Sequence, residues 1–285
     1  MADEADKLRV ISEHVCYDGT QRFIAHDSRE CGTEMRFSVY LPPQSRKGPV
    51  PVLYYLAGLT CTEETFMIKA GAQRLAAEHG LMLVAPDTSP RSPRLPGDDA
   101  SWDFGLGAGF YVDATVEPWS AHYRMYSYVT SELPALINEN FPAIANTQGI
   151  FGHSMGGHGA LVCALRNPER YKSVSAFAPI SAPMRCPWGQ KAFTGYLGPD
   201  PAAWADYDAS QLVSRTAFHS PILVDQGTSD KFLQEQLRPD LFAEACAEVE
   251  QPLELRMRAG YDHGYYFIQT FMADHVAWHA AALRA

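Results

Sequence analysis

The sequence has no long uninterrupted apolar stretch. None of its hydrophobic runs approaches the ~20 residues that a bilayer-spanning helix needs, so we expect no membrane segment and no membrane partner. Residues 1–7 are acidic and lack the basic-then-apolar order of a secretory signal peptide. By elimination, we expect a cytoplasmic protein.

Positive charge is also in short supply. The 285 residues contain 23 Lys and Arg against 33 Asp and Glu, which gives a formal net charge of −10. Binding to nucleic-acid phosphates requires a basic surface, so we expect no nucleic-acid partner. A substrate that carries carboxylates would gain no help from the overall field and would need a local basic pocket.

Cysteine pairs of the C-x-x-C type are absent. An even number of scattered cysteines would also fit the disulfides of a secreted protein, but a chain of this length can bury a large core without them. Cys163 lies in an apolar helical stretch that we interpret as core. We therefore expect free thiols in a reducing compartment. The six cysteines are Cys16, Cys31, Cys61, Cys163, Cys186 and Cys246.

Continuous apolar runs alternate along the chain with helical patterns. Such runs are typical of strands buried on both faces of a parallel sheet. The alternation predicts an α/β protein with a mostly parallel central sheet flanked by helices on both faces, and we expect residues 1–285 to form a single domain. Strands are predicted at 35–41, 51–57, 81–85, 149–152, 173–178, 221–224 and 253–257, and helices at 62–79, 128–140, 157–165, 240–249 and 265–283.

The segment 87–119 fits neither pattern, because it contains four prolines and four glycines. Loops of this length inside a domain are uncommon and are often functional, although composition alone leaves a surface excursion without a role equally open. The group Asp98, Asp99 and Asp103 in this segment could suggest a metal site. We interpret it instead as a solvated loop face, and we expect no metal.

The pattern G-x-S-x-G occurs at residues 152–156 (GHSMG). It follows a predicted strand and opens a helix rich in small residues, which is the setting of the nucleophile elbow in the α/β-hydrolase fold. There, the hydroxyl of Ser154 would project from the sheet, and glycines on either side would avoid collisions across the tight turn. The alternative is a glycine-rich turn with an incidental serine. We predict an α/β-hydrolase fold with Ser154 as the nucleophile.

A serine hydroxyl needs a base that removes its proton, and in this fold the acid and the histidine follow the serine along the chain. Asp225 and Asp230 both follow the serine. Asp230 lies beyond the predicted strand, on the loop where catalytic acids of such sheets occur, so we choose it over Asp225. His263 follows the next strand in a glycine-containing loop, and we choose it as the base.

The remaining histidines fit the role of base less well. His219 precedes a strand and would lie at the wrong end of the sheet. His275 and His279 are four residues apart in the last predicted helix, where packing or exposure explains them. His153 and His158 flank the nucleophile, but we expect the elbow to point them away from the base, in packing roles.

Stabilisation of the oxyanion requires backbone N–H groups near the nucleophile. The N–H of Met155 follows the serine and lies at the start of a helix, where negative charge is favoured. The second donor should come from the loop after the second predicted strand, where Gly58 permits close backbone approach. We choose the N–H of Leu59.

Six segments carry a further signal: 56–63 (LAGLTCTE), 101–114 (SWDFGLGAGFYVDA), 123–130 (YRMYSYVT), 152–159 (GHSMGGHG), 225–227 (DQG) and 261–263 (YDH). Together they resemble the S-formylglutathione hydrolase (esterase D) family, in family order and over most of the chain. The resemblance implies hydrolysis of S-formylglutathione to formate and glutathione through a formyl-serine, with Ser154, Asp230 and His263 as triad and Leu59 and Met155 as oxyanion donors. It also implies activity on small acyl esters, no cofactor and a homodimer.

A small acyl pocket is expected next to Leu59 and Cys61. Trp102, Trp188 and Tyr196 are candidate lining residues, with plain packing as the alternative. As part of the family's Thr-Cys-Thr segment, Cys61 is expected near the nucleophile, with a small buried hydrophobe as the alternative. We hypothesise that modifying Cys61 blocks the pocket; equal sensitivity of wild type and Cys61→Ser to a thiol reagent would contradict this.

Two other functions remain open at this point. A general small-acyl carboxylesterase or acyltransferase could use the same fold and triad, because the pocket decides the substrate. A non-catalytic binding module could also retain the fold, although the intact candidate triad argues against it.

Overall fold

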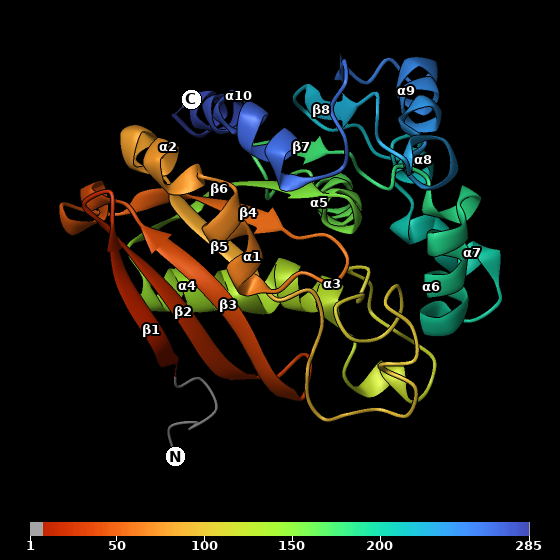
Figure 1. Cartoon of the computed structure of the whole chain (residues 1–285), viewed down its shortest axis with the longest axis horizontal. Helices are drawn as coiled ribbons and strands as arrows, with labels where there is room; N and C mark the ends of the chain where they lie inside the picture. Colours follow the sequence, from red (N-terminus) through yellow and green to blue (C-terminus); the bar gives the residue numbers. More distant parts are fainter. Residues whose placement is uncertain (1–7, 285) are drawn as a thin grey trace.

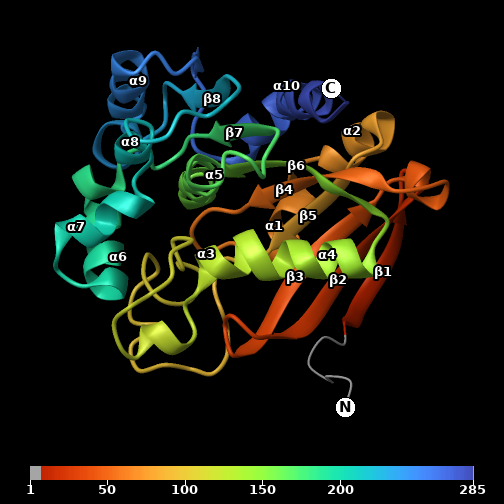
Figure 2. The same ribbon diagram turned by 180° about the vertical axis from the view of Figure 1, so that it is seen from behind.

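The computed structural model describes residues 8–284 and has one nine-stranded sheet with helices on both faces (Figures 1 and 2). The spatial order is β1-β2-β3-β5-β4-β6-β7-β8-β9. The pairs β1–β2, β2–β3 and β3–β5 are antiparallel, and the other five pairs are parallel, which confirms the predicted mostly parallel sheet. The strands are β1 (Arg9–Cys16), β2 (Gly19–Ser28), β3 (Thr33–Leu41), β4 (Val50–Leu56), β5 (Met82–Pro86), β6 (Ala143–His153), β7 (Ser173–Phe177), β8 (Ile222–Gly227) and β9 (Leu253–Arg258).

The helices form a layer on each side of this sheet. One face of the sheet is covered by α1, α2 and α10, which contact the strands or one another. The other face is covered by α4 and α5, which contact the strands (Figures 1 and 2). The helices are α1 (Glu63–Lys69), α2 (Ala72–His79), α3 (Met125–Ser127), α4 (Leu133–Asn140), α5 (Met155–Arg166), α6 (Pro187–Leu197), α7 (Pro201–Trp204), α8 (Ala209–Leu212), α9 (Pro239–Glu248) and α10 (Tyr265–Arg284).

The central strands are level at their carboxyl ends. Leu56 at the end of β4 pairs with Gly152 of β6, and His153 at the end of β6 pairs with Phe177 of β7. Every residue of β5, β7 and β8 is buried, as their continuous apolar sequences predict. The loops that follow β4, β6, β8 and β9 therefore meet along one edge of the sheet, where parallel sheets hold their ligands.

Strands β1 and β2 are not predicted by the sequence. They form an antiparallel extension at one edge of the sheet, and β1 has six exposed and two half-buried residues. An edge strand that is exposed on both faces shows neither a continuous apolar run nor a strict alternation, so its pattern carries no clear strand signal.

The predicted helix 62–79 is two helices in the structure. Gly71 separates α1 from α2 with a left-handed φ of 66°, and Gly80 ends α2 in the same conformation, so the second helix ends at residue 79 as predicted. At its start, Thr62 accepts a hydrogen bond from the Glu64 N–H, and Thr65 accepts one from the Thr62 N–H, which caps α1. The helices α6, α7 and α8 are not predicted.

The long segment between β5 and α3 is irregular but well packed. Asp98 is buried, with its carboxylate bound to Arg94 at 3.1 Å and to the Leu95 N–H at 2.8 Å, so the expected solvated face is wrong for this residue. Within residues 8–284, no helix combines the length and apolarity that crossing a membrane requires. The acidic residues 1–7 lie outside the described part, and the single-domain organisation of 1–285 stays a prediction.

Candidate active site

Ser154 lies in a strained turn between β6 and α5. Its φ of 57° and ψ of −119° are unusual for a residue with a side chain. The Ser154 N–H donates to the carbonyl of Phe177 at 3.0 Å, which anchors the turn to the neighbouring strand. A Cβ at Gly156 would overlap the backbone of Leu56, so only glycine fits there. The turn thus has the strand–turn–helix geometry that the sequence predicts for residues 152–156.

His263 and Asp230 form a close pair on the loops after β9 and β8. The His263 Nδ1 lies 2.5 Å from Asp230 Oδ2, and the Asp230 side chain is fully buried while that of His263 is 18% exposed. The other Asp230 oxygen accepts the Phe232 N–H at 2.9 Å. Because an ionised carboxylate only accepts hydrogen bonds, this pairing places the proton on Nδ1 and leaves Nε2 free to act as a base.

Ser154 and His263 line the same small pocket, which has a volume of about 170 Å³. In the described part of the chain no hydrogen bond joins the two side chains; such catalytic contacts often tighten only in the substrate complex. The volume is small compared with pockets for drug-sized ligands. The lining residues are Gly58, Leu59, Cys61, Trp102, His153, Ser154, Trp188, Phe232, His263 and Tyr265.

Aromatic rings form a continuous wall around this pocket. Phe232, Tyr265 and His153 belong to it, and sequence reasoning missed all three as lining residues. His153 lies against the base, contrary to the expectation that the elbow points it away. Successive ring centroids are 5.4 Å apart for Trp102–Trp188, 4.7 Å for Trp188–Phe232, 5.1 Å for Phe232–His263, 4.4 Å for His263–His153 and 6.1 Å for His153–Tyr265.

Tyr196 does not line the pocket, so this expectation needs correction. Its ring is buried and stacks on Phe104 at 4.5 Å. Its hydroxyl donates to the carbonyl of Ala108 and accepts the Gly105 N–H, both at 2.9 Å. Tyr196 therefore fastens helix α6 to the long irregular loop.

The loop that carries Leu59 is held from several sides. The Leu59 N–H and the Met155 N–H donate to no other group in the described residues, so both remain available to an oxyanion. Thr60 N–H donates to the carbonyl of Gly107 at 2.8 Å. The carbonyl of Cys61 accepts from Thr88 Oγ1 at 2.5 Å and from Arg91 Nη2 at 2.9 Å.

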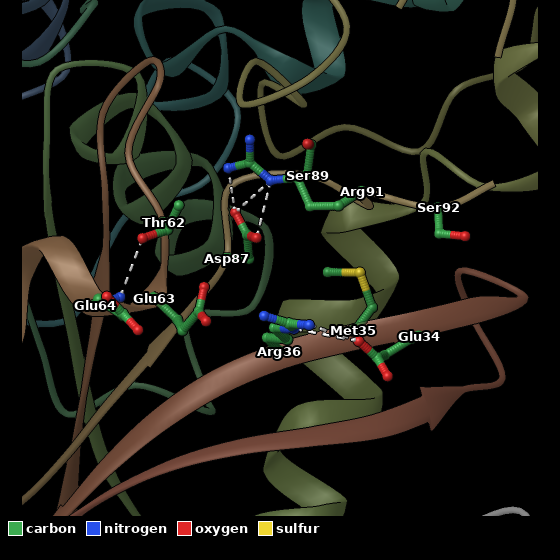
Figure 3. Close-up of a pocket in the computed structure, with 10 residues that line it drawn as sticks. All are labelled: Glu34, Met35, Arg36, Thr62, Glu63, Glu64, Asp87, Ser89, Arg91 and Ser92. Atoms are coloured by element: carbon green, nitrogen blue, oxygen red, sulfur yellow. Dashed lines mark hydrogen bonds and ion pairs between the residues drawn. The ribbon is translucent and has the colours of Figure 1, made fainter. Parts of the chain in front are cut away.

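A larger pocket of about 530 Å³ adjoins this loop, and neither Ser154 nor His263 lines it (Figure 3). Arg91 forms a two-point ion pair there with the buried Asp87, with Nη2–Oδ1 at 2.6 Å and Nε–Oδ2 at 2.9 Å. Burial, with repulsion from Asp87, raises the pKa of Glu63 to about 7. Arg91 links this pocket to the candidate active site through the Cys61 carbonyl.

The competing acid, Asp225, lies inside the molecule and does not line the pocket. It forms an ion pair with Arg258 at 3.0 Å, and its Oδ2 also lies 3.5 Å from His275 Nε2. Burial opposes its ionisation, but the hydrogen bonds from His275 and Arg258 outweigh this and lower the pKa of Asp225. Its role in the geometry is to join β8, β9 and α10.

The other histidines near the elbow and in α10 are buried. His158 lies 2.9 Å from the carbonyl of Phe110, and burial lowers its pKa to about 4. His275 and His279 both contact the hydroxyl of Ser175 at 2.8 Å, which ties α10 to β7. These positions agree with packing roles.

The cysteines are all unpaired, as expected. Cys61 lines the pocket and is half-buried, and burial raises the pKa of its thiol. Among residues 8–284, no cluster of three or more His, Cys, Asp or Glu side chains forms a candidate metal site.

Comparisons with known proteins agree with this geometry. Residues 28–280 match the esterase family model, described as "Putative esterase". An S-formylglutathione hydrolase of Mus musculus is 57% identical over 98% of this chain and 99% of its own length, and one of Paracoccus denitrificans is 53% identical over 96% and 97%. A solved S-formylglutathione hydrolase structure from Agrobacterium tumefaciens has a TM-score of 0.94 at 53% identity, covering 96% of this chain and 99% of its own.

A more distant structure shows the fold alone. A Staphylococcus aureus serine hydrolase, FphF, has a TM-score of 0.74 at 20% identity, over 92% of this chain and 98% of its own. The predicted α/β-hydrolase class is thereby confirmed. With near-complete coverage at more than 50% identity, the chain belongs to the S-formylglutathione hydrolase family of esterases.

Proposed function

We propose that the protein hydrolyses S-formylglutathione to formate and glutathione, with Ser154, Asp230 and His263 as its catalytic triad. The observation that carries the proposal is the His263–Asp230 pair at 2.5 Å, whose imidazole lines a pocket of about 170 Å³ together with the strained Ser154. The sequence identity to S-formylglutathione hydrolases supports the choice of substrate. A formyl group is the smallest acyl group, so it suits a pocket of this size.

The reaction follows from the positions of these groups. Ser154 Oγ attacks the thioester carbonyl while His263 Nε2 accepts its proton, and Asp230 holds the ring and stabilises the imidazolium. The N–H groups of Leu59 and Met155 donate to the oxyanion, and the second lies at the N-terminus of α5, where negative charge is favoured. Collapse of the tetrahedral intermediate breaks the C–S bond, and the proton on His263 goes to the leaving sulfur.

The second half of the reaction releases formate. Water enters the pocket, His263 Nε2 removes its proton, and the hydroxide attacks the formyl ester of Ser154. The same two N–H groups stabilise the second oxyanion. The serine then leaves with the proton from His263, which restores the enzyme. No cofactor takes part in this proposal.

Steady-state kinetics test the proposal directly. We expect kcat/KM for S-formylglutathione to exceed that for p-nitrophenyl acetate, and Ser154→Ala to lose both activities by about 10⁴-fold or more while keeping its circular dichroism spectrum. A higher kcat/KM for the acetyl ester would favour a general carboxylesterase. Turnover that survives in Ser154→Ala would contradict the proposed triad.

We also propose that the protein is a cytoplasmic homodimer. The unpaired state of all six cysteines supports a reducing compartment. The apolar side chains of edge strand β1, with Val15 86% and Val10 55% exposed, offer a surface that a second copy could cover. Sedimentation equilibrium of wild type and Val15→Lys tests the dimer; a monomeric wild type would contradict it.

A further inference from the structure

The substrate of the proposed function carries its own negative charge. Glutathione is a γ-glutamyl tripeptide whose thiol lies in the middle residue and whose two carboxylates lie at its two ends. The protein has a net charge of −10, so its overall field repels such a molecule. Local cations near the pocket must therefore offset this repulsion, and they need to lie on two sides of the reacting sulfur.

Lys69 is one such cation. It is the exposed last residue of α1, and its Nζ lies 5.8 Å from the centroid of the Tyr265 ring, which lines the pocket of Ser154. Tyr265 also borders a second hollow of about 410 Å³, whose other lining residues are Lys69, Tyr266 and Gln269. Within residues 8–284, no carboxylate lies within ion-pair distance of Lys69, so its charge is available to a ligand.

Lys231 is the second. It directly follows Asp230 and is exposed, and its Nζ lies 4.8 Å from the centroid of the Phe232 ring. Phe232 lines the same pocket and contacts the His263 ring. Like Lys69, Lys231 has no ion-pair partner in the described residues. Lys191 on the nearby helix α6, in contrast, is paired with Asp103.

The two lysines lie at separate parts of the aromatic wall. Its ring contacts run from Phe232 through His263 and His153 to Tyr265, so the base lies between the rings that carry the two ammonium groups. An extended tripeptide spans roughly 10 Å. With the sulfur held at Ser154, the two arms of such a tripeptide leave the reacting atom in opposite directions.

We propose that Lys69 and Lys231 bind the two carboxylates of the glutathione moiety, one at each end of the tripeptide. This inference rests on the proposed function. The aromatic faces of Tyr265 and Phe232 hold the ammonium groups beside the pocket by cation–π contact, and Gln269 adds a donor on the Lys69 side. The lysines thus supply affinity for the leaving group and take no part in bond breaking.

The experiment compares charged and neutral substrates in Lys69→Met, Lys231→Met and the double variant. Each single variant is expected to raise KM for S-formylglutathione by about 2- to 5-fold, because exposed ion pairs are weak, with kcat unchanged. The double variant should raise it roughly tenfold. Kinetics on the neutral p-nitrophenyl acetate should not change, and high salt should bring the wild-type KM toward that of the variants.

Two matched controls isolate the charge. Lys69→Arg keeps the charge and should retain the wild-type KM. Lys172→Met removes another exposed lysine, which precedes β7 at the opposite end of the sheet, and should have no effect. The S-formyl derivative of glutathione esterified at its glycine carboxylate identifies the arm, because only one of the two single variants should still change its KM.

The failure of this inference differs from the failure of the proposed function. An unchanged KM in the double variant, with wild-type turnover of S-formylglutathione intact, overturns the lysine assignment alone. Equal losses on p-nitrophenyl acetate overturn it too, because they indicate damage to the pocket. If the wild type does not turn over S-formylglutathione, the proposed function fails; inhibition of p-nitrophenyl acetate hydrolysis by S-methylglutathione then tests the lysines independently, and equal inhibition of the wild type and double variant overturns their role.

Discussion

Two aspartates five residues apart, Asp225 and Asp230, illustrate how position in the fold separates catalysis from stability. We expect Asp230→Asn to keep the fold and to lower kcat by about 10⁴-fold, because an amide can no longer hold the His263 Nδ1–H tautomer. Asp225→Asn should keep its catalytic constants and lower the free energy of unfolding by about 1–3 kcal/mol, because it weakens the ion pair with Arg258 and changes the contact with His275.

Urea unfolding and steady-state kinetics of both variants check this pair of expectations. The kinetic constants should change in Asp230→Asn, and the free energy of unfolding should change in Asp225→Asn. Each variant therefore serves as the control for the other. A large kinetic loss in Asp225→Asn, together with little loss in Asp230→Asn, would reverse the assignment of the acid.

The proximity of the proposed triad residues could be predicted because it depends on chain order and strand ends. Ser154, Asp230 and His263 each follow a strand, and the carboxyl ends of parallel strands meet at one edge of the sheet. The pocket wall could not be predicted in this way. Phe232 and Tyr265 directly follow or lie near triad residues, but whether their rings face the nucleophile depends on side-chain directions that sequence spacing does not encode.

At the scale of the element, the loop after β4 depends on Arg91 for its position. The Arg91 guanidinium donates to the carbonyl of Cys61, which lies two residues after Leu59 in the chain. The same guanidinium is held by the carboxylate of Asp87 (Figure 3). We expect Arg91→Ala to lower kcat for all acyl substrates by about tenfold. This loss is smaller than the cost of losing an oxyanion donor completely, which is about 2.7–4 kcal/mol of transition-state stabilisation. KM should change little, because Arg91 does not line the catalytic pocket.

Arg94→Ala is the control for this prediction, because Arg94 is in the same segment but pairs with Asp98 and Asp99. Its kcat should match that of the wild type. Arg91→Lys should recover only part of the activity, since an ammonium cannot form the two-point contact with Asp87. A wild-type kcat in Arg91→Ala would show that the loop holds its position without the guanidinium.

Elements were predictable where burial made their patterns plain. The strands β4 to β8 and the helix α10 follow from continuous apolar runs and an apolar stripe. The division of 62–79 at Gly71 was missed because a single glycine is tolerated inside many helices, and only its left-handed φ of 66° identifies the break. Strand β1 was missed because both of its faces are exposed.

At the scale of the whole molecule, burial favours the neutral form of four histidines. They are His153, His158, His275 and His279, and burial is the largest cause that lowers the pKa of each below 6.5. In the unfolded chain these rings are free to bind protons below about pH 6.5. Burial also raises the pKa of Glu63 to about 7, so this group binds a proton more readily in the native protein than in the unfolded chain. Its effect on the pH dependence of stability is opposite to that of the histidines, but it is a single group and they are four.

The sign of the pH dependence follows from this balance. Below pH 6.5 the unfolded chain binds more protons than the native protein, so the free energy of unfolding should fall as the pH is lowered from 6.5 to 5. Each histidine that stays neutral contributes at most about 1.4 kcal/mol per pH unit. Urea unfolding at intervals of pH between 5 and 8 measures the slope of the free energy of unfolding against pH.

Two variants test the contribution of one buried ring. His158→Gln keeps a donor for the Phe110 carbonyl and should lower the slope by up to the contribution of one histidine. His14→Gln changes an exposed histidine and should leave the slope unchanged. A free energy of unfolding that is constant or rises on acidification through this range would show that the buried rings are protonated in the native protein.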